Sequence, residues 1–235
     1  MGKSKLRKWA EMEKCSHVIQ PRFEDVFRKD HELKGQWKEA FFGNKNPIIL
    51  ELGCGKGEYT IEKARQYPEK NFLGIDIKGA RMWKGAMMAR NQSMENVGFL
   101  RTRIELIESF FDKDEVDEIW ITFPDPQLKK KRNKKRLTGS RFLNHYRSFL
   151  IKDGLIHLKT DSTELYNYTL NLVNRNNLDI ISSSNDLYSE EKPDENLLIR
   201  THYEQMFLDA GKKITYICFR IDNNKPVIEI NEDDN

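Results

Sequence analysis

The feature that most constrains the fold is a short apolar run that ends in a cluster of glycines. The run is Pro47-Ile-Ile-Leu-Glu-Leu52, and Gly53-Cys-Gly-Lys-Gly57 follows it directly. The run predicts a buried strand, and the glycines predict a tight turn in which the backbone can approach a ligand closely. Residues 58–67 then show helical periodicity that ends at Pro68. A strand, a glycine turn and a helix are therefore expected in that order.

The same alternation continues along the chain. We expect further strands over 71–77, 97–102, 118–123 and 154–160, and helices over 79–91, 140–150 and 162–175. Such alternation predicts an α/β fold with a doubly wound, mostly parallel sheet. Two late strand candidates, 178–183 and 214–221, flank a helix candidate at 198–210. They are expected to close the sheet with an antiparallel strand near one edge.

The length of 235 residues suits one large domain. No internal repeat and no linker rich in Pro, Gly or Ser divides the chain. We therefore expect an N-terminal extension over 1–46, one domain over 47–221 and an acidic tail over 222–235. The last seven residues carry four anions and little that could pack.

Cysteine usage and hydropathy exclude several classes of protein. The three cysteines, at positions 15, 54 and 218, are far apart and form no Cys-x-x-Cys pair. A disulfide framework and a metal site are therefore not expected. No apolar run reaches 18 residues, so we expect a cytoplasmic protein without a membrane span. The sequence leaves open whether it is a monomer or a homodimer.

The positive charge is concentrated in one place. The net charge is +3, yet residues 129–136 hold seven cations in eight positions, so the rest of the chain sums to 3 − 7 = −4. A run of this kind is either a solvated loop or a patch that binds a polyanion such as nucleic acid.

The glycine spacing discriminates among cofactors. In a doubly wound sheet, ligands bind outside the carboxyl ends of the strands. Gly53, Gly55 and Gly57 are spaced Gly-x-Gly-x-Gly, whereas a dinucleotide site has Gly-x-Gly-x-x-Gly, and Glu58 would repel a pyrophosphate. An NAD-dependent dehydrogenase is therefore disfavoured. A nucleoside without phosphates, such as S-adenosylmethionine, fits better.

Two carboxylates extend this predicted cofactor site. Asp76 ends the second strand, 76 − 57 = 19 residues after Gly57, where a carboxylate accepts hydrogen bonds from ribose hydroxyls. Glu51 ends the first strand, within reach of the amino acid part of the same ligand. This segment resembles motif I and the following acidic residue of class I S-adenosylmethionine-dependent methyltransferases, which have a Rossmann-like fold.

Three later segments carry a second resemblance. The first is Phe123-Pro-Asp-Pro-Gln-Leu-Lys-Lys-Lys-Arg-Asn-Lys-Lys-Arg-Leu-Thr138, followed by His157-Leu-Lys-Thr-Asp161 and Thr201-His-Tyr-Glu204. They are similar to the signature segments of bacterial tRNA (guanine-N7)-methyltransferases, which methylate the variable-loop guanosine of tRNA. The similarity extends from about Ile48 to Arg220.

This resemblance implies roles for particular residues. Asp125 would be the catalytic-site carboxylate and would also lie against the cofactor, which Glu51 and Asp76 bind. The substrate tRNA would contact Lys129, Asp161, Thr201, His202, Tyr203 and Glu204. The N-terminal extension is a candidate for further contact with RNA.

The chain departs from the family pattern at two places. Gln127-Leu128 stands where the family has Trp-Pro, which puts a local stacking role in doubt. Arg103 stands where the family has a cofactor-contacting Asp, so Arg103, Glu105 or backbone amides would take that role.

The residues suit methylation at guanine N7. This nitrogen carries a lone pair and no proton, so orientation rather than base catalysis is required. Two alternatives remain. One is a methyltransferase of exocyclic base amines, and the order of Pro and Asp in Phe123-Pro-Asp-Pro126 argues against it. The other is a non-catalytic RNA-binding protein on a methyltransferase fold, against which intact Glu51, Asp76 and Asp125 count.

Overall fold

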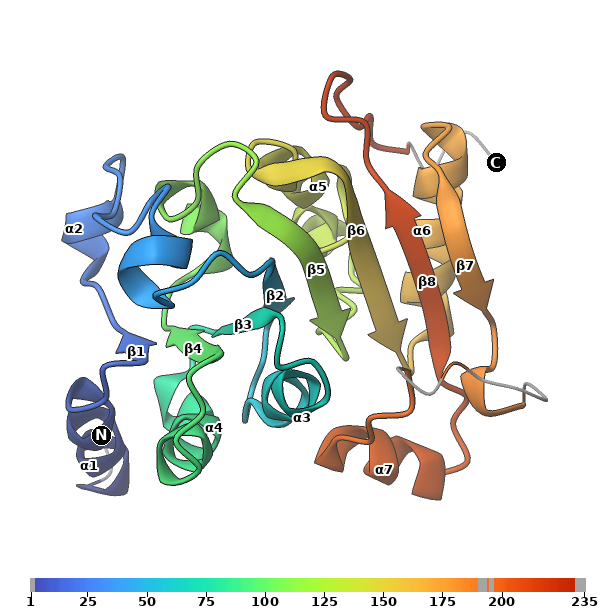
Figure 1. The fold of residues 1–235 in the computed structure, drawn as a ribbon. Helices are drawn as coiled ribbons and strands as arrows, with labels where there is room; N and C mark the ends of the chain where they lie inside the picture. The colour runs from blue at the N-terminus through green and yellow to red at the C-terminus, as the bar shows by residue number, and fades with distance from the viewer. Residues whose placement is uncertain (1–2, 190–193, 195–196, 231–235) are drawn as a thin grey trace. The chain divides into compact units, whose positions relative to one another are not determined.

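The computed structural model describes residues 3–189, 194 and 197–230 of the chain. These residues form two compact units, unit 1 up to Asp117 and unit 2 from Glu118 on (Figure 1). Each unit contains strands with helices packed on them. Within the described residues, no helix is long and apolar enough to cross a membrane.

Unit 1 contains parallel strands in the order β1-β4-β3-β2. Its elements are α1 (Lys3–Glu13), β1 (Val18–Ile19), α2 (Phe23–Val26), the π-helix η1 (Trp37–Phe41), β2 (Ile48–Leu52), α3 (Glu58–Gln66), β3 (Asn71–Ile75), α4 (Gly79–Asn91), β4 (Val97–Leu100) and the 3₁₀ helix η2 (Ile104–Ser109). Every residue of β2, β3 and β4 is buried. Burial on both faces explains why these strands read as continuous apolar runs rather than as alternating ones.

The N-terminal segment packs into unit 1. Helix α1 lies along α4, and its Met12 is fully buried (Figure 1). Trp37 is also fully buried, and its indole Nε1 donates a hydrogen bond to the Phe110 carbonyl at 2.7 Å. The predicted domain boundaries, including the one between 46 and 47, stay a prediction.

Unit 2 contains strands in the order β5-β6-β8-β7. Its elements are β5 (Val116–Thr122), which begins at the end of unit 1, η3 (Lys130–Lys135), α5 (Ser140–Tyr146), β6 (Leu150–Thr160), α6 (Thr163–Arg175), β7 (Ile180–Ser184), η4 (Leu187–Ser189), α7 (His202–Asp209) and β8 (Thr215–Arg220). Strand β8 is antiparallel to both β6 and β7. The expected antiparallel strand near one edge is therefore confirmed.

The described start of the predicted acidic tail, residues 222–230, makes contacts within unit 2. Val227 is buried, and its backbone exchanges two hydrogen bonds with the side-chain amide of Asn144 on α5. The Glu229 carboxylate accepts hydrogen bonds from Ser140 and from the Tyr168 hydroxyl. The buried Val227 side chain and the hydrogen bonds between side-chain amides and the backbone together hold this segment. Residues 231–235 lie outside the described part.

Candidate functional site

The glycine loop joins β2 to α3 in a conformation that only glycine adopts readily. Gly53, Gly55 and Gly57 have φ values of +81°, +56° and +72°. A Cβ at Gly57 would lie 2.6 Å from Cε1 of Phe99 on β4, so no larger residue fits there. At Gly53, in contrast, a Cβ would meet nothing within 4 Å. The loop therefore packs closely at its end and leaves open space at its start.

Asp76 is held directly against this loop. Its Oδ2 accepts a hydrogen bond from the Gly55 amide at 2.9 Å, and its Oδ1 accepts one from the Lys78 amide at 2.7 Å. Each carboxylate oxygen has a second lone pair for a further donor. The structure thus brings together two of the predicted cofactor residues, Gly55 and Asp76, and the binding of ribose hydroxyls by Asp76 stays a prediction.

Glu51 is buried at the end of β2 and is tied to the start of α3. Its Oε2 accepts hydrogen bonds from the Thr60 amide at 2.9 Å and from the Thr60 hydroxyl. These bonds fix the first turn of α3 relative to β2. Its contact with the amino acid part of the cofactor stays a prediction.

Cys54 is a packing residue of the loop. Its thiol is free and buried. Burial, and then the nearby carboxylates of Glu51 and Asp76, raise the pKa of Cys54 well above its usual value. The thiol therefore stays protonated and unreactive at neutral pH.

The loop and Asp76 together fit an adenosine-containing cofactor. The open space at Gly53 admits a ligand against the backbone, and the Asp76 carboxylate supplies acceptors beside it. The described residues contain no cluster of three or more His, Cys, Asp or Glu side chains suited to a metal ion.

Arg103 lies exposed before η2 and turns toward the N-terminal segment. Its guanidinium carbon is 5.8 Å from the centre of the Phe23 ring. Glu105, the other residue considered for the same role, is exposed in the first turn of η2. A cofactor contact by either side chain stays a prediction.

In unit 2, Asp125 lies exposed on a turn with unusual backbone geometry. Phe123 and Gln127, on either side of it, have φ values of +47° and +50°, a region that side-chain-bearing residues rarely adopt. Each such residue costs about 1–3 kcal/mol, which the surroundings must offset. The Gln127 amide donates a hydrogen bond to Asp125 Oδ1 at 3.1 Å. The turn thus holds the predicted catalytic carboxylate in a defined place.

This turn is anchored at its start. The Phe123 amide donates to the Lys159 carbonyl on β6 at 2.8 Å, and the Phe123 ring packs against Phe207 of α7 with centroids 5.6 Å apart. Strands β5 and β6 run in the same direction, and α7 lies near the end where they finish (Figure 1). The Asp125 turn, the end of β6 and α7 therefore lie at one end of the strands of unit 2.

A buried ion pair joins β6 to α7, and the sequence analysis did not anticipate it. Lys159 Nζ lies 2.6 Å from Glu204 Oε1, and both side chains are fully buried. Tyr188 donates to the same carboxylate oxygen at 2.7 Å, and Lys159 also donates to the carbonyls of Leu197 and Ile199. Burial lowers the pKa of Lys159, although the Glu204 carboxylate opposes this shift. The only available signal was a lysine inside the apolar run before Asp161.

The predicted substrate residues divide into two groups. In the first group, the Thr201 hydroxyl caps α7 by accepting a hydrogen bond from the Glu204 amide at 3.2 Å, and the Glu204 carboxylate forms its ion pair with Lys159. His202 and Tyr203 are exposed. Asp161 forms an ion pair with Lys212, whose Nζ lies 2.5 Å from Asp161 Oδ2. Substrate contact by these residues stays a prediction, and the exposed pair is the most accessible.

The basic segment, residues 129–136, is less uniform than its sequence. Lys129, Lys131, Arg132, Lys134 and Lys135 are exposed. Arg136 is instead buried, and its guanidinium carbon lies 4.2 Å from the centre of the Tyr168 ring. Arg136 therefore anchors the segment, while the five exposed cations face solvent.

Comparisons with known proteins agree with this organisation. Residues 45–217 match the model of a family described as "Putative methyltransferase". A tRNA (guanine-N(7)-)-methyltransferase of Christiangramia forsetii is 54% identical to this chain over 94% of it and 99% of the relative. One of Bacteroides thetaiotaomicron is 48% identical over 99% of this chain and 93% of the relative.

Solved structures show the fold. The 16S rRNA methyltransferase KamB matches 75% of this chain and 88% of its own with a TM-score of 0.57 at 12% identity. A 16S rRNA (adenine(1408)-N(1))-methyltransferase from Catenulisporales acidiphilia, solved with its cosubstrate SAM, matches 77% of this chain and 88% of its own with a TM-score of 0.54 at 16% identity. The predicted α/β fold of the class I methyltransferases is thereby confirmed.

Proposed function

Because the chain belongs to the family of tRNA (guanine-N(7)-)-methyltransferases, we propose that it transfers a methyl group from S-adenosylmethionine to N7 of a guanosine in the variable loop of tRNA. The observation that carries the proposal is the 54% identity to a relative of that name, which extends over 94% of this chain.

S-adenosylmethionine is the cofactor, and when bound it supplies an electrophilic methyl group on a sulfonium. In unit 1, Asp76 would hold the ribose, because the amides of Gly55 and Lys78 already orient its carboxylate. The open start of the loop at Gly53 would let the ligand approach the backbone.

In this proposal, Asp125 orients the guanine and stabilises the charge that develops on it. N7 needs no general base, so the contribution of the protein is orientation and charge. Positive charge develops on the purine as the methyl group arrives, and a fixed carboxylate stabilises it. A carboxylate also accepts from the N1–H and N2–H groups of guanine, which adenine lacks. The constrained turn around Asp125 supports this role, and Asp161 is the second candidate.

The exposed cations of the basic segment would contact the tRNA backbone. Phosphate contacts of this type supply affinity and carry little sequence information. His202 and Tyr203 are exposed on α7, where they would add contacts to the same substrate.

The direct test is transfer of tritiated methyl groups to bulk tRNA, followed by identification of the modified nucleoside by mass spectrometry. We expect 7-methylguanosine. A product methylated on an exocyclic amine would indicate the first alternative, and tRNA binding without transfer would indicate the non-catalytic one.

The mechanism has its own test in single-turnover rates at saturating tRNA and cofactor. Since N7 has no proton to lose, we expect a nearly flat rate from about pH 6.5 to 8.5. Asp125→Asn keeps the shape and removes the charge, so it should slow the step by roughly 100-fold or more. A tenfold rise in rate per pH unit across this window would reveal an essential deprotonation and refute the mechanism.

A further inference from the structure

Unit 1 contains a cavity to which the proposed function assigns no ligand. A cavity of about 470 Å³ lies where β3 and β4 end, and its other wall is the N-terminal segment from α1 to α2. Trp9, Arg22 and Phe23 contribute from the N-terminal segment, and Arg101 and Arg103 follow β4. Residues far apart in the sequence thus form one hollow.

The cavity carries an excess of positive charge. Its lining contains Arg22, Arg101 and Arg103 against the single carboxylate of Glu13. Within the described residues, none of the three arginines forms an ion pair with a carboxylate. Burial lowers the pKa of Arg101, so this cation is partly removed from water without a compensating anion. An anionic ligand would compensate it.

Two aromatic rings accompany these cations. The Arg101 guanidinium lies 4.3 Å from the centre of the Trp9 ring, and Phe23 is 46% exposed at the surface. The lining also holds unused hydrogen-bonding capacity, since Trp9 Nε1 and Gln20 Oε1 have no partner among the described residues. Aromatic faces, guanidinium groups and a polar donor and acceptor are what proteins use to bind unpaired nucleotides.

We propose that this cavity binds an unpaired nucleotide of the substrate tRNA, with the phosphate on the arginines and the base on the aromatic faces. The inference rests on the proposed function and adds a site in unit 1 to the basic segment of unit 2. Arg103 is also a candidate for contact with S-adenosylmethionine, but that cofactor is positive at its sulfonium and has no phosphate, so the three arginines together suit a nucleotide phosphate better.

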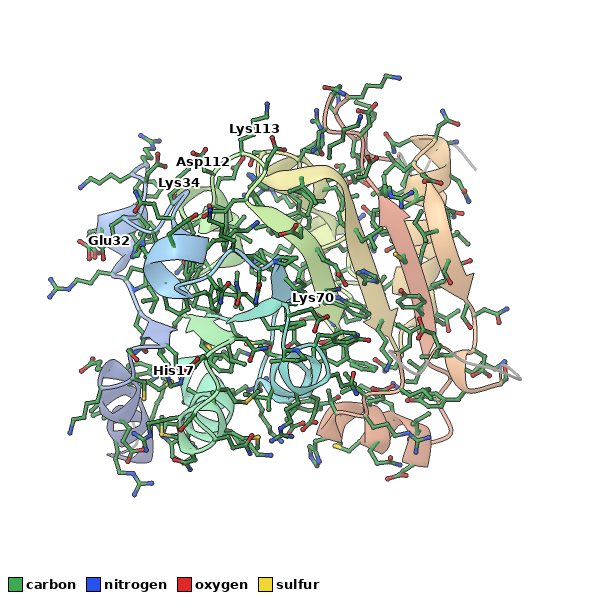
Figure 2. All side chains as sticks on the ribbon, viewed as in Figure 1. His17, Glu32, Lys34, Lys70, Asp112 and Lys113 are labelled. Atoms are coloured by element: carbon green, nitrogen blue, oxygen red, sulfur yellow. The ribbon has the colours of Figure 1, made fainter. Side chains whose placement is uncertain are left out.

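The test compares two variants that each remove one exposed cation from unit 1. Arg22→Gln alters the cavity, and Lys113→Gln is the matched control just before β5 (Figure 2). Affinity for tRNA is measured at several salt concentrations, and S-adenosylmethionine affinity is measured by calorimetry. For Arg22→Gln we expect tRNA binding to weaken several-fold and its logarithmic salt slope to fall by about 0.7–0.9. Lys113→Gln should match the parent, and cofactor affinity should be unchanged in both.

A third variant separates stacking from charge. Phe23→Ser removes an exposed ring and no charge, so it should weaken tRNA binding by roughly 5- to 100-fold with the salt slope unchanged. The proposal is overturned if Arg22→Gln and Phe23→Ser both bind tRNA like Lys113→Gln. It is also overturned if they lose cofactor affinity alone, which would assign the cavity to the adenosine of the cofactor. Failure of the proposed function is distinct, because the parent protein would then transfer no methyl group to tRNA.

Discussion

Replacing Lys159 by Met tests how the predicted substrate segment is held. Lys159 and Glu204 are both fully buried, with Nζ and Oε1 2.6 Å apart. Without the lysine, the Glu204 carboxylate would remain buried with Tyr188 as its hydrogen-bond donor. Removing one partner of such a pair leaves an uncompensated charge, which costs about 3–5 kcal/mol of unfolding free energy. We therefore expect a loss of that size for Lys159→Met.

The assay is a double-mutant cycle with urea unfolding followed by circular dichroism. Lys159→Met/Glu204→Leu removes both charges, and apolar replacements of buried pairs are often nearly neutral. The double variant should still lose some unfolding free energy, because Tyr188 and the carbonyls of Leu197 and Ile199 lose their hydrogen-bond partners. An unsatisfied buried group of this kind costs about 1–3 kcal/mol. We expect the double variant to be at least as stable as Lys159→Met alone. If the loss in the double variant equals the sum of the losses in Lys159→Met and Glu204→Leu, the two side chains are not coupled and the predicted cost of an unpaired buried charge is refuted.

A functional readout accompanies the stability measurement. Since Lys159 also bonds the carbonyls of Leu197 and Ile199, it fixes the segment that leads into α7. Lys159→Met should therefore raise the KM for tRNA several-fold while leaving the Kd for S-adenosylmethionine unchanged. An unchanged KM in the folded variant would remove the positioning role and leave only a structural one.

Three further predictions follow from other contacts. Asp76→Ala should weaken S-adenosylmethionine binding by about 1–3 kcal/mol, since charged hydrogen bonds are lost, and calorimetry showing the parent affinity would exclude Asp76 from the site. The triple variant Lys131→Gln/Lys134→Gln/Lys135→Gln should flatten the salt dependence of tRNA binding by up to about 0.9 in slope per lost contact, with cofactor affinity as the control. Burial holds the pKa of His17 (Figure 2) below its usual 6.5. As the pH falls below about 6.5, His17 therefore binds a proton more readily in the unfolded protein than in the folded one, and the folded protein loses stability. His17→Gln should lose less stability than the parent between pH 7.5 and 5, and urea midpoints that fall equally in both proteins would contradict this.

The parts of the site that could be predicted are those controlled by local sequence. Consecutive apolar residues indicated β2, and positive φ values explain why Gly53, Gly55 and Gly57 stand where they do. The contact between Gly55 and Asp76 follows from the parallel pairing of β2 and β3, which brings their carboxyl ends side by side. Periodicity and strand direction are sufficient to predict contacts of this kind.

The parts that could not be predicted depend on contacts between distant residues. Nothing local distinguishes Arg136, buried on Tyr168, from the exposed cations before it. Lys159 likewise reads as one polar residue in a strand, and only the position of α7 shows that it is buried. The N-terminal segment lacked a pattern because its helix α1 buries few residues, Met12 among them, against α4.

Residues that the proposed reaction uses are held by several specific constraints. A buried ion pair holds α7, left-handed backbone flanks Asp125, and Asp76 is fixed by two amide hydrogen bonds. The left-handed backbone persists only because the surrounding structure compensates its strain, and all of these constraints reduce the freedom of the groups that they hold. Methylation at N7 requires no proton transfer, so the rate depends on how well the reacting groups are oriented. Rigid placement is therefore what this chemistry requires of the chain, and general acids or bases are not.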